Sequence, residues 1–143
     1  MEEKITLPRI VWGLWRIKTW NRAPKELART MNKLLDLGVD TVDLADIYGD
    51  YEATKMFGEV LQAEPTLSKR IKVVTKAGIV LLSDKHPEVY VKHYDTSAEH
   101  IIASVDQSLL DLGRDHIDLL LIHRPDPYMD PLEVGHAFDE LYK

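Results

Sequence analysis

Residues 117–123 of the chain read IDLLLIH, an almost continuous apolar run that ends at a histidine. A run without the alternation of a half-buried strand is typical of a parallel strand covered on both faces. Gly113 ends the helical pattern before this run, and Pro125 follows it. The stretch therefore predicts a β-strand over Ile117–Ile122 in an α/β fold.

Three further apolar runs lie upstream and are separated by helical patterns. We expect strands at Ile5–Leu14, Val39–Leu44 and Ile71–Thr75. Apolar residues recur at helical spacing between the runs, at Leu27, Met31, Leu34 and Leu35, at Ala53, Met56, Phe57, Val60 and Leu61, and at Ala98, Ile101, Ile102, Val105, Leu109 and Leu112. These patterns predict four strand-then-helix units, with connections long enough for right-handed parallel crossovers.

The helix boundaries carry their own signals. Gly38 is placed to stop the first helix. Thr96 and Glu99 fit a capping box at the start of the third helix. Residues 130–131, an Asp-Pro pair, predict the start of a fourth helix. The connection 79–95 shows no periodicity, and loops of that length in a compact domain are often functional.

Two architectures fit four parallel units, an open doubly wound sheet and a (β/α)8 barrel. No Gly-x-Gly-x-x-Gly follows the first strand, so the dinucleotide-binding turn of the open sheet is missing. Polar residues at the C-terminal ends of several strands favour the barrel. A full barrel takes about 250 residues, so the 143 residues of this chain predict one domain, residues 1–143, forming the (β/α)4 N-terminal half of a barrel.

The composition excludes several classes of partner. The formal net charge is −6, and no basic stripe is present, which argues against nucleic acid and anionic membrane surfaces. The chain has no cysteine, which excludes disulfides and suits a reducing compartment. Its start lacks the cationic and apolar regions of a signal peptide, and no apolar run reaches the length of a membrane span. We expect a cytoplasmic protein that binds neither nucleic acid nor membrane.

Four ionisable residues follow the predicted strands: Asp43, Tyr48, Lys76 and His123. Taken singly, each is more often structural, as a turn residue, a packing aromatic or a solvated strand end. Because the ends of parallel strands lie side by side, the four should meet at one rim. Together they predict a site that handles protons.

Carbonyl reduction gives each of the four a distinct role. The reaction needs a proton for the carbonyl oxygen, and a free tyrosine, with a pKa of about 10, is too weak an acid unless its phenolate is stabilised. We expect the Lys76 ammonium to stabilise the Tyr48 phenolate and Asp43 to hold the ammonium in place. A neutral His123 would orient the substrate oxygen.

The same residues lie in motifs that resemble those of the aldo-keto reductases. Residues 42–49 (VDLADIYG) resemble the Asp-x4-Tyr signature of that family. Val74-Thr75-Lys76 is similar to its third-strand lysine, and residues 121–125 (LIHRP) are similar to its fourth-strand histidine. The resemblance extends over essentially the whole chain. It implies a (β/α)8 barrel that uses NADP(H) to reduce a small aldehyde or ketone.

The resemblance also implies neighbours for the cofactor and the substrate. Leu14 and Trp15 fall where a Gly-x-Trp turn borders the nicotinamide, and Asp43 would approach the nicotinamide ribose. Trp15 would also line the substrate pocket with Tyr48, His123 and Arg124, although Trp15 has the alternative of a rim aromatic that only packs. Arg124 replaces the aromatic residue often found after the family's histidine, which could bring in an anionic group.

Half a barrel leaves two strand edges unpaired and the inner face of the sheet open. We expect such a chain to pair with a C-terminal half, to self-associate or to be marginally stable. Two hypotheses therefore stay open. The first is a reductase whose main cofactor-binding part is absent or supplied by another chain, and the second is a non-catalytic half-barrel scaffold or binding subunit.

Overall fold

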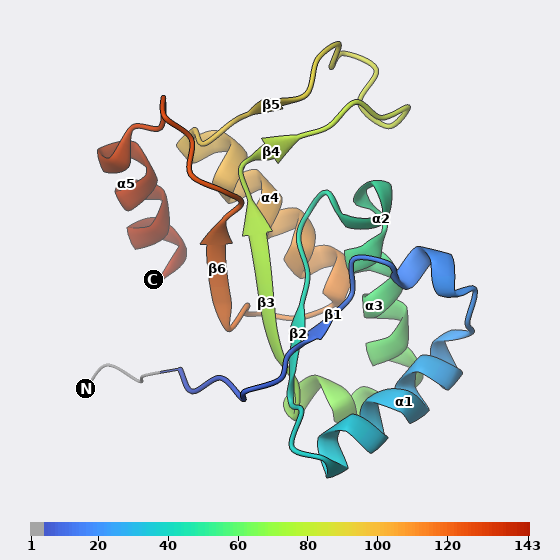
Figure 1. Cartoon of the computed structure of the whole chain (residues 1–143). Coiled ribbons are helices and arrows are strands. Elements are labelled where there is room, and N and C mark those ends of the chain that lie inside the picture. Colours follow the sequence, from blue (N-terminus) through green and yellow to red (C-terminus); the bar gives the residue numbers. More distant parts are fainter. Residues whose placement is uncertain (1–4) are drawn as a thin grey trace.

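The computed structural model describes residues 5–143, so the start of the chain, where we expect no signal peptide, lies partly outside the described residues. One parallel sheet has the strand order β1-β2-β3-β6 (Figure 1). Its members are β1 (Trp12–Gly13), β2 (Thr41–Asp43), β3 (Lys72–Ala77) and β6 (Leu119–Ile122). The sheet order follows the chain order, so every crossover leads to the adjacent strand. This topology confirms the predicted parallel (β/α) portion of a barrel.

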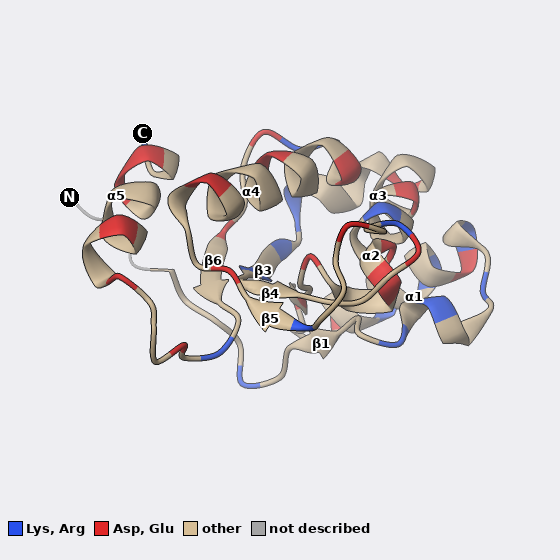
Figure 2. Cartoon of the chain, turned by 90° about the horizontal axis from the view of Figure 1, so that it is seen from above, with Lys and Arg blue, Asp and Glu red and all other residues tan. Residues whose placement is uncertain are grey.

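The helices cover one face of this sheet. The long helices are α1 (Pro24–Asp36), α3 (Ala53–Ala63), α4 (Ala98–Leu112) and α5 (Pro131–Leu141). Short helical segments are η1 (Ile17–Trp20), α2 (Tyr48–Tyr51) and η2 (Pro65–Lys69). Figure 2 shows the four long helices in an arc on one side of the strands. Within residues 5–143, no helix is both long and apolar enough to cross a bilayer.

Strand register determines which side chains enter the core beneath the helices. Trp12 pairs with Val42, and Val42 pairs with Val73. Paired residues share a face of the sheet, and Val42 and Val73 are fully buried in the cluster formed with α1 and α3. Leu120 and Ile122 pack in a second cluster with α4 and α5.

The alternate residues project from the face that lacks helices. Gly13, Asp43, Val74 and Leu119 lie in one row across the strands. One step towards the C-terminal ends, Lys76 pairs with Leu121, which is 39% exposed. The expectation that the last strand is covered on both faces is therefore wrong at Leu121, while Leu119 on the same face is partly buried.

Three local expectations differ from the structure. The first strand is only Trp12–Gly13 instead of Ile5–Leu14, because β2, the one strand that pairs with it in residues 5–143, spans three residues. The connection 79–95 contains an antiparallel pair, β4 (Ile79–Val80) with β5 (His93–Tyr94). Helix α4 is capped by Ser97, whose side chain accepts from the His100 amide, and not by Thr96. The predicted glycine stop at Gly38 and the Asp130 cap of α5 are confirmed.

Candidate active site

The Lys76 ammonium lies at the centre of the predicted cluster. Its Nζ is 2.6 Å from Asp43 Oδ1, 2.8 Å from the Leu44 carbonyl and 3.1 Å from Tyr48 Oη. An ammonium has three N–H donors, and each has an oxygen within reach here. The Lys76 side chain is only 14% exposed, so these contacts replace the water that it would otherwise bind. The arrangement joins β2, β3 and the turn after β2 through one cation.

Tyr48 is held in this position by the turn that follows β2. The Asp46 amide donates to the Lys76 carbonyl, and Asp46 Oδ1 accepts from the Ile47 amide at 2.7 Å. The Tyr48 amide then donates to the Ala45 carbonyl. These bonds make Asp46 a residue of the turn. They place the Tyr48 phenol over β3, where the Lys76 Nζ lies 4.8 Å from the centre of its ring.

His123 reaches the same rim from the end of β6. Its ring meets the Tyr48 ring edge to face, with the ring centres 5.8 Å apart. Its backbone amide donates to the Ala77 carbonyl, and its buried Nδ1 has no hydrogen-bond partner among the described residues. Burial, followed by the positive charges of Lys76 and Arg124, lowers the pKa of His123 below its ordinary value of 6.5. The imidazole is therefore neutral at pH 7.

The remaining predicted site residues lie around these four. Leu14 is fully buried in the core, so only its backbone, whose amide donates to the Asp43 carbonyl, belongs to the rim. Trp15 is 61% exposed, and the Arg16 guanidinium lies 5.3 Å from the centre of its ring. Arg124 is exposed and has a φ of 84°. Among residues 5–143, neither the Trp15 nor the Arg124 side chain hydrogen-bonds to the four.

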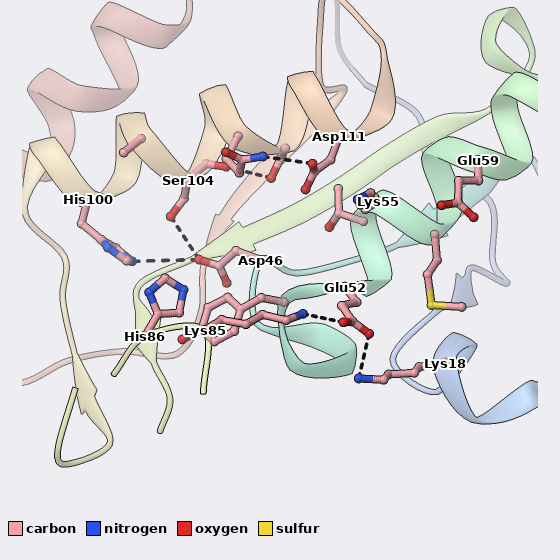
Figure 3. A pocket seen from close by; sticks show the side chains of 16 residues that line it. Lys18, Asp46, Glu52, Lys55, Glu59, Lys85, His86, His100, Ser104 and Asp111 are labelled. Atoms are coloured by element: carbon pink, nitrogen blue, oxygen red, sulfur yellow. Dashed lines mark hydrogen bonds and ion pairs between the residues drawn. The ribbon is translucent and has the colours of Figure 1, made fainter. Parts of the chain in front are cut away.

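A groove of about 940 Å³ lies outside this cluster, between α3, α4 and the β4–β5 hairpin (Figure 3). Its lining includes Asp46 but not Tyr48, Lys76 or His123. Ser104 donates to Asp46 Oδ2, and His100 Nε2 lies 3.9 Å from the same oxygen. Burial raises the pKa of Asp46 to about 6. Sequence reasoning did not identify the contact of Asp46 with Ser104 of α4, because no local pattern links residues 58 positions apart.

A partial parallel (β/α) barrel with ionisable side chains at the C-terminal strand ends is the architecture of a barrel enzyme. Residues 9–143 match the model of the Aldo/keto reductase family. The chain therefore belongs to the aldo-keto reductase family, as the sequence motifs indicate.

Several relatives share nearly half of their aligned residues with this chain. It is 48% identical over 141 residues to the uncharacterized oxidoreductase YcsN of Bacillus subtilis, covering 99% of this chain and 47% of that protein. It is 47% identical over 142 residues to a 6-dehydroglucose reductase of Agrobacterium fabrum, covering 99% and 48%. The oxidoreductase YdhF of Escherichia coli is 47% identical over 94% of this chain and 45% of its own length.

Solved structures agree with this fold. A putative aldo-keto reductase from Pseudomonas aeruginosa superposes with a TM-score of 0.76 at 24% identity, over 96% of this chain and 51% of its own. A glycerol dehydrogenase from Gluconobacter oxydans has a TM-score of 0.74 at 27% identity, over 95% and 41%. The chain thus spans about half the length of the proteins it matches.

Proposed function

We propose that this chain carries the proton-transfer residues of an NADP(H)-dependent reductase that converts an aldehyde or ketone to an alcohol, with Tyr48 as the proton donor. One observation supports this assignment above all. The Lys76 ammonium contacts both the Tyr48 phenol and the Asp43 carboxylate, at 3.1 and 2.6 Å. A scaffold has no evident need for a cation that bridges a phenol and a carboxylate at an open rim.

The proposed proton transfer follows from these contacts. As the Tyr48 proton moves to the substrate oxygen, the adjacent ammonium stabilises the phenolate that forms. Asp43 neutralises the ammonium and fixes its direction. The neutral His123 ring, in edge contact with Tyr48, hydrogen-bonds the substrate oxygen and directs it towards the phenol. The exposed Arg124 beside it would contact an anionic group of the substrate.

The residues of the rim fit one side of a nicotinamide cofactor. No described residue hydrogen-bonds to Asp43 Oδ2, and the Asp43 side chain is 30% exposed, so this oxygen is free to accept from a ribose hydroxyl. The Trp15 ring and the Leu14 backbone would border the nicotinamide. When bound, NADPH supplies the hydride that reduces the carbonyl carbon. We also propose that the protein acts in the cytoplasm, since a chain without cysteine suits that reducing compartment.

The names of two similar proteins suggest which carbonyl substrate to test first. One relative is a 6-dehydroglucose reductase, and one structural neighbour is a glycerol dehydrogenase. The compounds in both names, 6-dehydroglucose and glycerol, are small and carry several hydroxyl groups. We therefore propose a small carbonyl compound bearing hydroxyl groups as the first substrate to test, beside a reactive aldehyde such as 4-nitrobenzaldehyde.

A partner for the open sheet is part of this proposal. Within residues 5–143, β1 pairs only with β2 and β6 pairs only with β3. Unpaired parallel edges are sites of association, so we propose that β1 and β6 pair with a second half-barrel. That half is either a C-terminal half or another copy of this chain. Size-exclusion chromatography with light scattering tests the second option, and a stable monomer at all concentrations would contradict self-association.

The direct test of function has two stages. The chain is first titrated with NADPH while nicotinamide fluorescence is followed, alone and mixed with the separately produced C-terminal half of E. coli YdhF. NADPH oxidation is then measured with a small carbonyl compound bearing hydroxyl groups and, separately, with 4-nitrobenzaldehyde. We expect binding and turnover in the mixture, and a loss of turnover of at least about 100-fold with Tyr48→Phe.

The matched control is Tyr90→Phe, since Tyr90 is 89% exposed. Equal turnover by wild type and Tyr48→Phe would refute Tyr48 as the proton donor. The open edges of β1 and β6 favour one second candidate, a non-catalytic half-barrel that only pairs with another chain. A stable complex of the two halves that fails to bind millimolar NADPH would support that candidate instead.

A further inference from the structure

The residues after Tyr48 have an unusual backbone conformation. Gly49, Asp50 and Tyr51 all have positive φ, at 60°, 58° and 61°. A left-handed conformation is easy for glycine but strained for other residues, and it is rare for a bulky aromatic. Such strain persists only where the surrounding contacts impose it. The contacts of Tyr51 and its neighbours therefore need to be identified.

The Tyr51 hydroxyl binds the backbone of the β4–β5 hairpin. Its Oη accepts from the Leu81 amide at 2.8 Å and lies 3.5 Å from the Leu81 carbonyl. The Tyr51 ring also meets the His86 ring edge to face, with the centres 4.5 Å apart. Tyr51 and Leu81 are 30 residues apart in the chain. A side chain that only packed would not need a hydroxyl directed at a backbone amide.

Lys85 and Glu52 add a second connection between the same two segments. Lys85 Nζ donates to the Asp50 carbonyl at 2.7 Å, inside the left-handed stretch. Glu52 lies between two ammonium groups: its Oε2 is 2.7 Å from Lys18 Nζ, and its Oε1 is 2.7 Å from Lys85 Nζ (Figure 3). Hydrogen bonds from Lys18 and Lys85 lower the pKa of Glu52 to about 2. The carboxylate is thus ionised at any working pH and connects η1, the Tyr48 turn and the hairpin.

We propose that Tyr51 is a positioning residue for Tyr48: its hydroxyl fastens the left-handed turn that presents Tyr48 to the backbone of the β4–β5 hairpin, with Glu52 and Lys85 as a second fastening. The inference rests on the proposed function only in taking Tyr48 as the reacting group. The turn begins directly after Tyr48, so its conformation helps to set where the phenol lies relative to Lys76, beside the backbone bonds of Asp46 and Tyr48 described above. The hairpin also starts directly after β3, which carries Lys76. The β4–β5 hairpin is therefore connected both to the turn after Tyr48, through Tyr51, and to the strand that carries Lys76.

The test compares Tyr51→Phe with Tyr90→Phe, which removes an exposed hydroxyl from the same hairpin. Tyr51→Phe keeps the ring on His86 and deletes only the hydroxyl. By hydrogen-exchange NMR, we expect the Leu81 amide to exchange roughly 5- to 10-fold faster in Tyr51→Phe, as for one lost hydrogen bond. The ring signals of Tyr48 and the amide signals of residues 47–52 should shift or broaden. Tyr90→Phe should change none of these.

A second variant tests the same connection without changing Tyr51. Glu52→Gln removes the charge that binds Lys18 and Lys85 but keeps the side-chain volume, and it should shift the same Tyr48 signals. Far-UV circular dichroism and urea unfolding identify any variant that loses the fold. Unchanged Tyr48 signals in a folded Tyr51→Phe protein would overturn the proposal, as would equal effects of Tyr51→Phe and Tyr90→Phe.

The same variants separate this inference from the proposed function. In the reconstituted form, Tyr51→Phe should lower kcat about 5- to 10-fold with little change in KM, because the hydroxyl contacts the hairpin and not the substrate. If wild type binds no NADPH, the proposed function fails, yet the NMR comparison still decides the positioning role. If turnover is present and Tyr51→Phe leaves both kcat and the Tyr48 signals unchanged, the positioning role alone is refuted.

Discussion

The Lys76 Nζ lies 2.6 Å from Asp43 Oδ1, although the two residues are 33 positions apart in the chain. Both project from the inner face of the sheet, where Asp43 lies beside Val74 and Lys76 lies one step further along β3. Their side chains are 30% and 14% exposed. An ion pair with this little water around it is stronger than a surface pair but still partly solvated.

We expect Lys76→Met to lower the free energy of unfolding by about 1 to 3 kcal/mol, because Asp43 and Tyr48 each lose a charged hydrogen-bond partner. Urea unfolding measures the change, and Lys55→Met, at an exposed position of α3, is the matched control. A double-mutant cycle with Asp43→Asn should give a coupling of about 1 kcal/mol or more. Additive effects of the two substitutions would show that the contact contributes nothing to stability.

A second prediction concerns the charge on His123. Since the positive charge of Arg124 is one cause of its lowered pKa, Arg124→Gln should raise the pKa of His123. Glutamine keeps a side chain at the strained φ of 84°, so the backbone cost is unchanged. The midpoint is followed by NMR of the imidazole ring signals. His100, whose lowered pKa has causes that do not include Arg124, is the internal reference.

The sign of the stability effect follows from the same shift. His123 stays neutral in the folded protein at pH values where it is charged in the unfolded chain. It therefore makes stability fall as the pH drops below about 6.5. Arg124→Gln should make that loss shallower. If Arg124→Gln leaves the titration midpoint of His123 unchanged, the Arg124 charge does not contribute to the lowered pKa of His123.

The meeting of Asp43, Lys76 and Tyr48 could be predicted from sequence because parallel strands place their C-terminal ends together. Asp43 and Lys76 lie at the ends of two short strand patterns separated by a helical pattern, which predicts neighbouring parallel strands, and their contact needs no knowledge of loops. The contact of Tyr51 with Leu81 could not be predicted, because it depends on a left-handed turn at a tyrosine. Nothing in the residue type indicates such a turn.

The length of the first strand and the cap of α4 could not be predicted from the sequence either. The apolar run at Ile5–Leu14 is long enough for a full strand, but a strand extends only where a partner offers hydrogen bonds, and β2 is short. Thr96 and Ser97 are both good caps, and the choice depends on Asp95, which accepts from the Ser97 amide and hydroxyl. These outcomes are set by neighbouring segments.

A third prediction follows from the burial of Asp46. Its pKa rises from 3.8 to about 6 on folding, so between these values the folded protein holds a proton that the unfolded chain has lost. Asp46 therefore makes stability fall as the pH rises from about 4 to 6. Asp46→Asn removes the charge and keeps one acceptor oxygen for the Ile47 amide, while the oxygen that accepts from Ser104 is replaced by an amide nitrogen, which can donate to the Ser104 hydroxyl instead. It should stabilise the chain at pH 7 by up to about 3 kcal/mol.

Urea unfolding at pH 4, 5, 6 and 7 measures this difference, with Asp106→Asn at an exposed position of α4 as the control. Asp46→Asn and wild type should converge at pH 4, where wild-type Asp46 is protonated in the folded state. A destabilisation that grows from pH 4 to pH 7 would mean that the site favours the Asp46 charge, and a difference that is the same at every pH would mean that folding does not shift the Asp46 pKa.

The fourth prediction concerns the contact between α3 and α4. A Cβ at Gly58 would lie 1.9 Å from the Asp111 carbonyl oxygen, which is a backbone atom of α4 and cannot move alone. Gly135, in the middle of the last helix, has nothing within 4 Å of its would-be Cβ. Glycine to alanine inside a helix gains up to about 1 kcal/mol of intrinsic stability at either position. Gly58→Ala and Gly135→Ala should therefore gain the same helix propensity and differ only in what the added Cβ contacts.

At Gly58 the collision should outweigh the propensity gain, since overpacking a tight contact costs about 1 to 3 kcal/mol or more. We expect Gly58→Ala to destabilise the chain by roughly 2 kcal/mol and Gly135→Ala to stabilise it by about 0.5 to 1 kcal/mol. Urea unfolding of both variants measures the difference. Because α4 also supplies Ser104 and His100 to Asp46, Gly58→Ala should shift the NMR signals of Asp46, and Gly135→Ala should not. Stabilisation by Gly58→Ala would show that α3 and α4 lie further apart in solution than this contact requires.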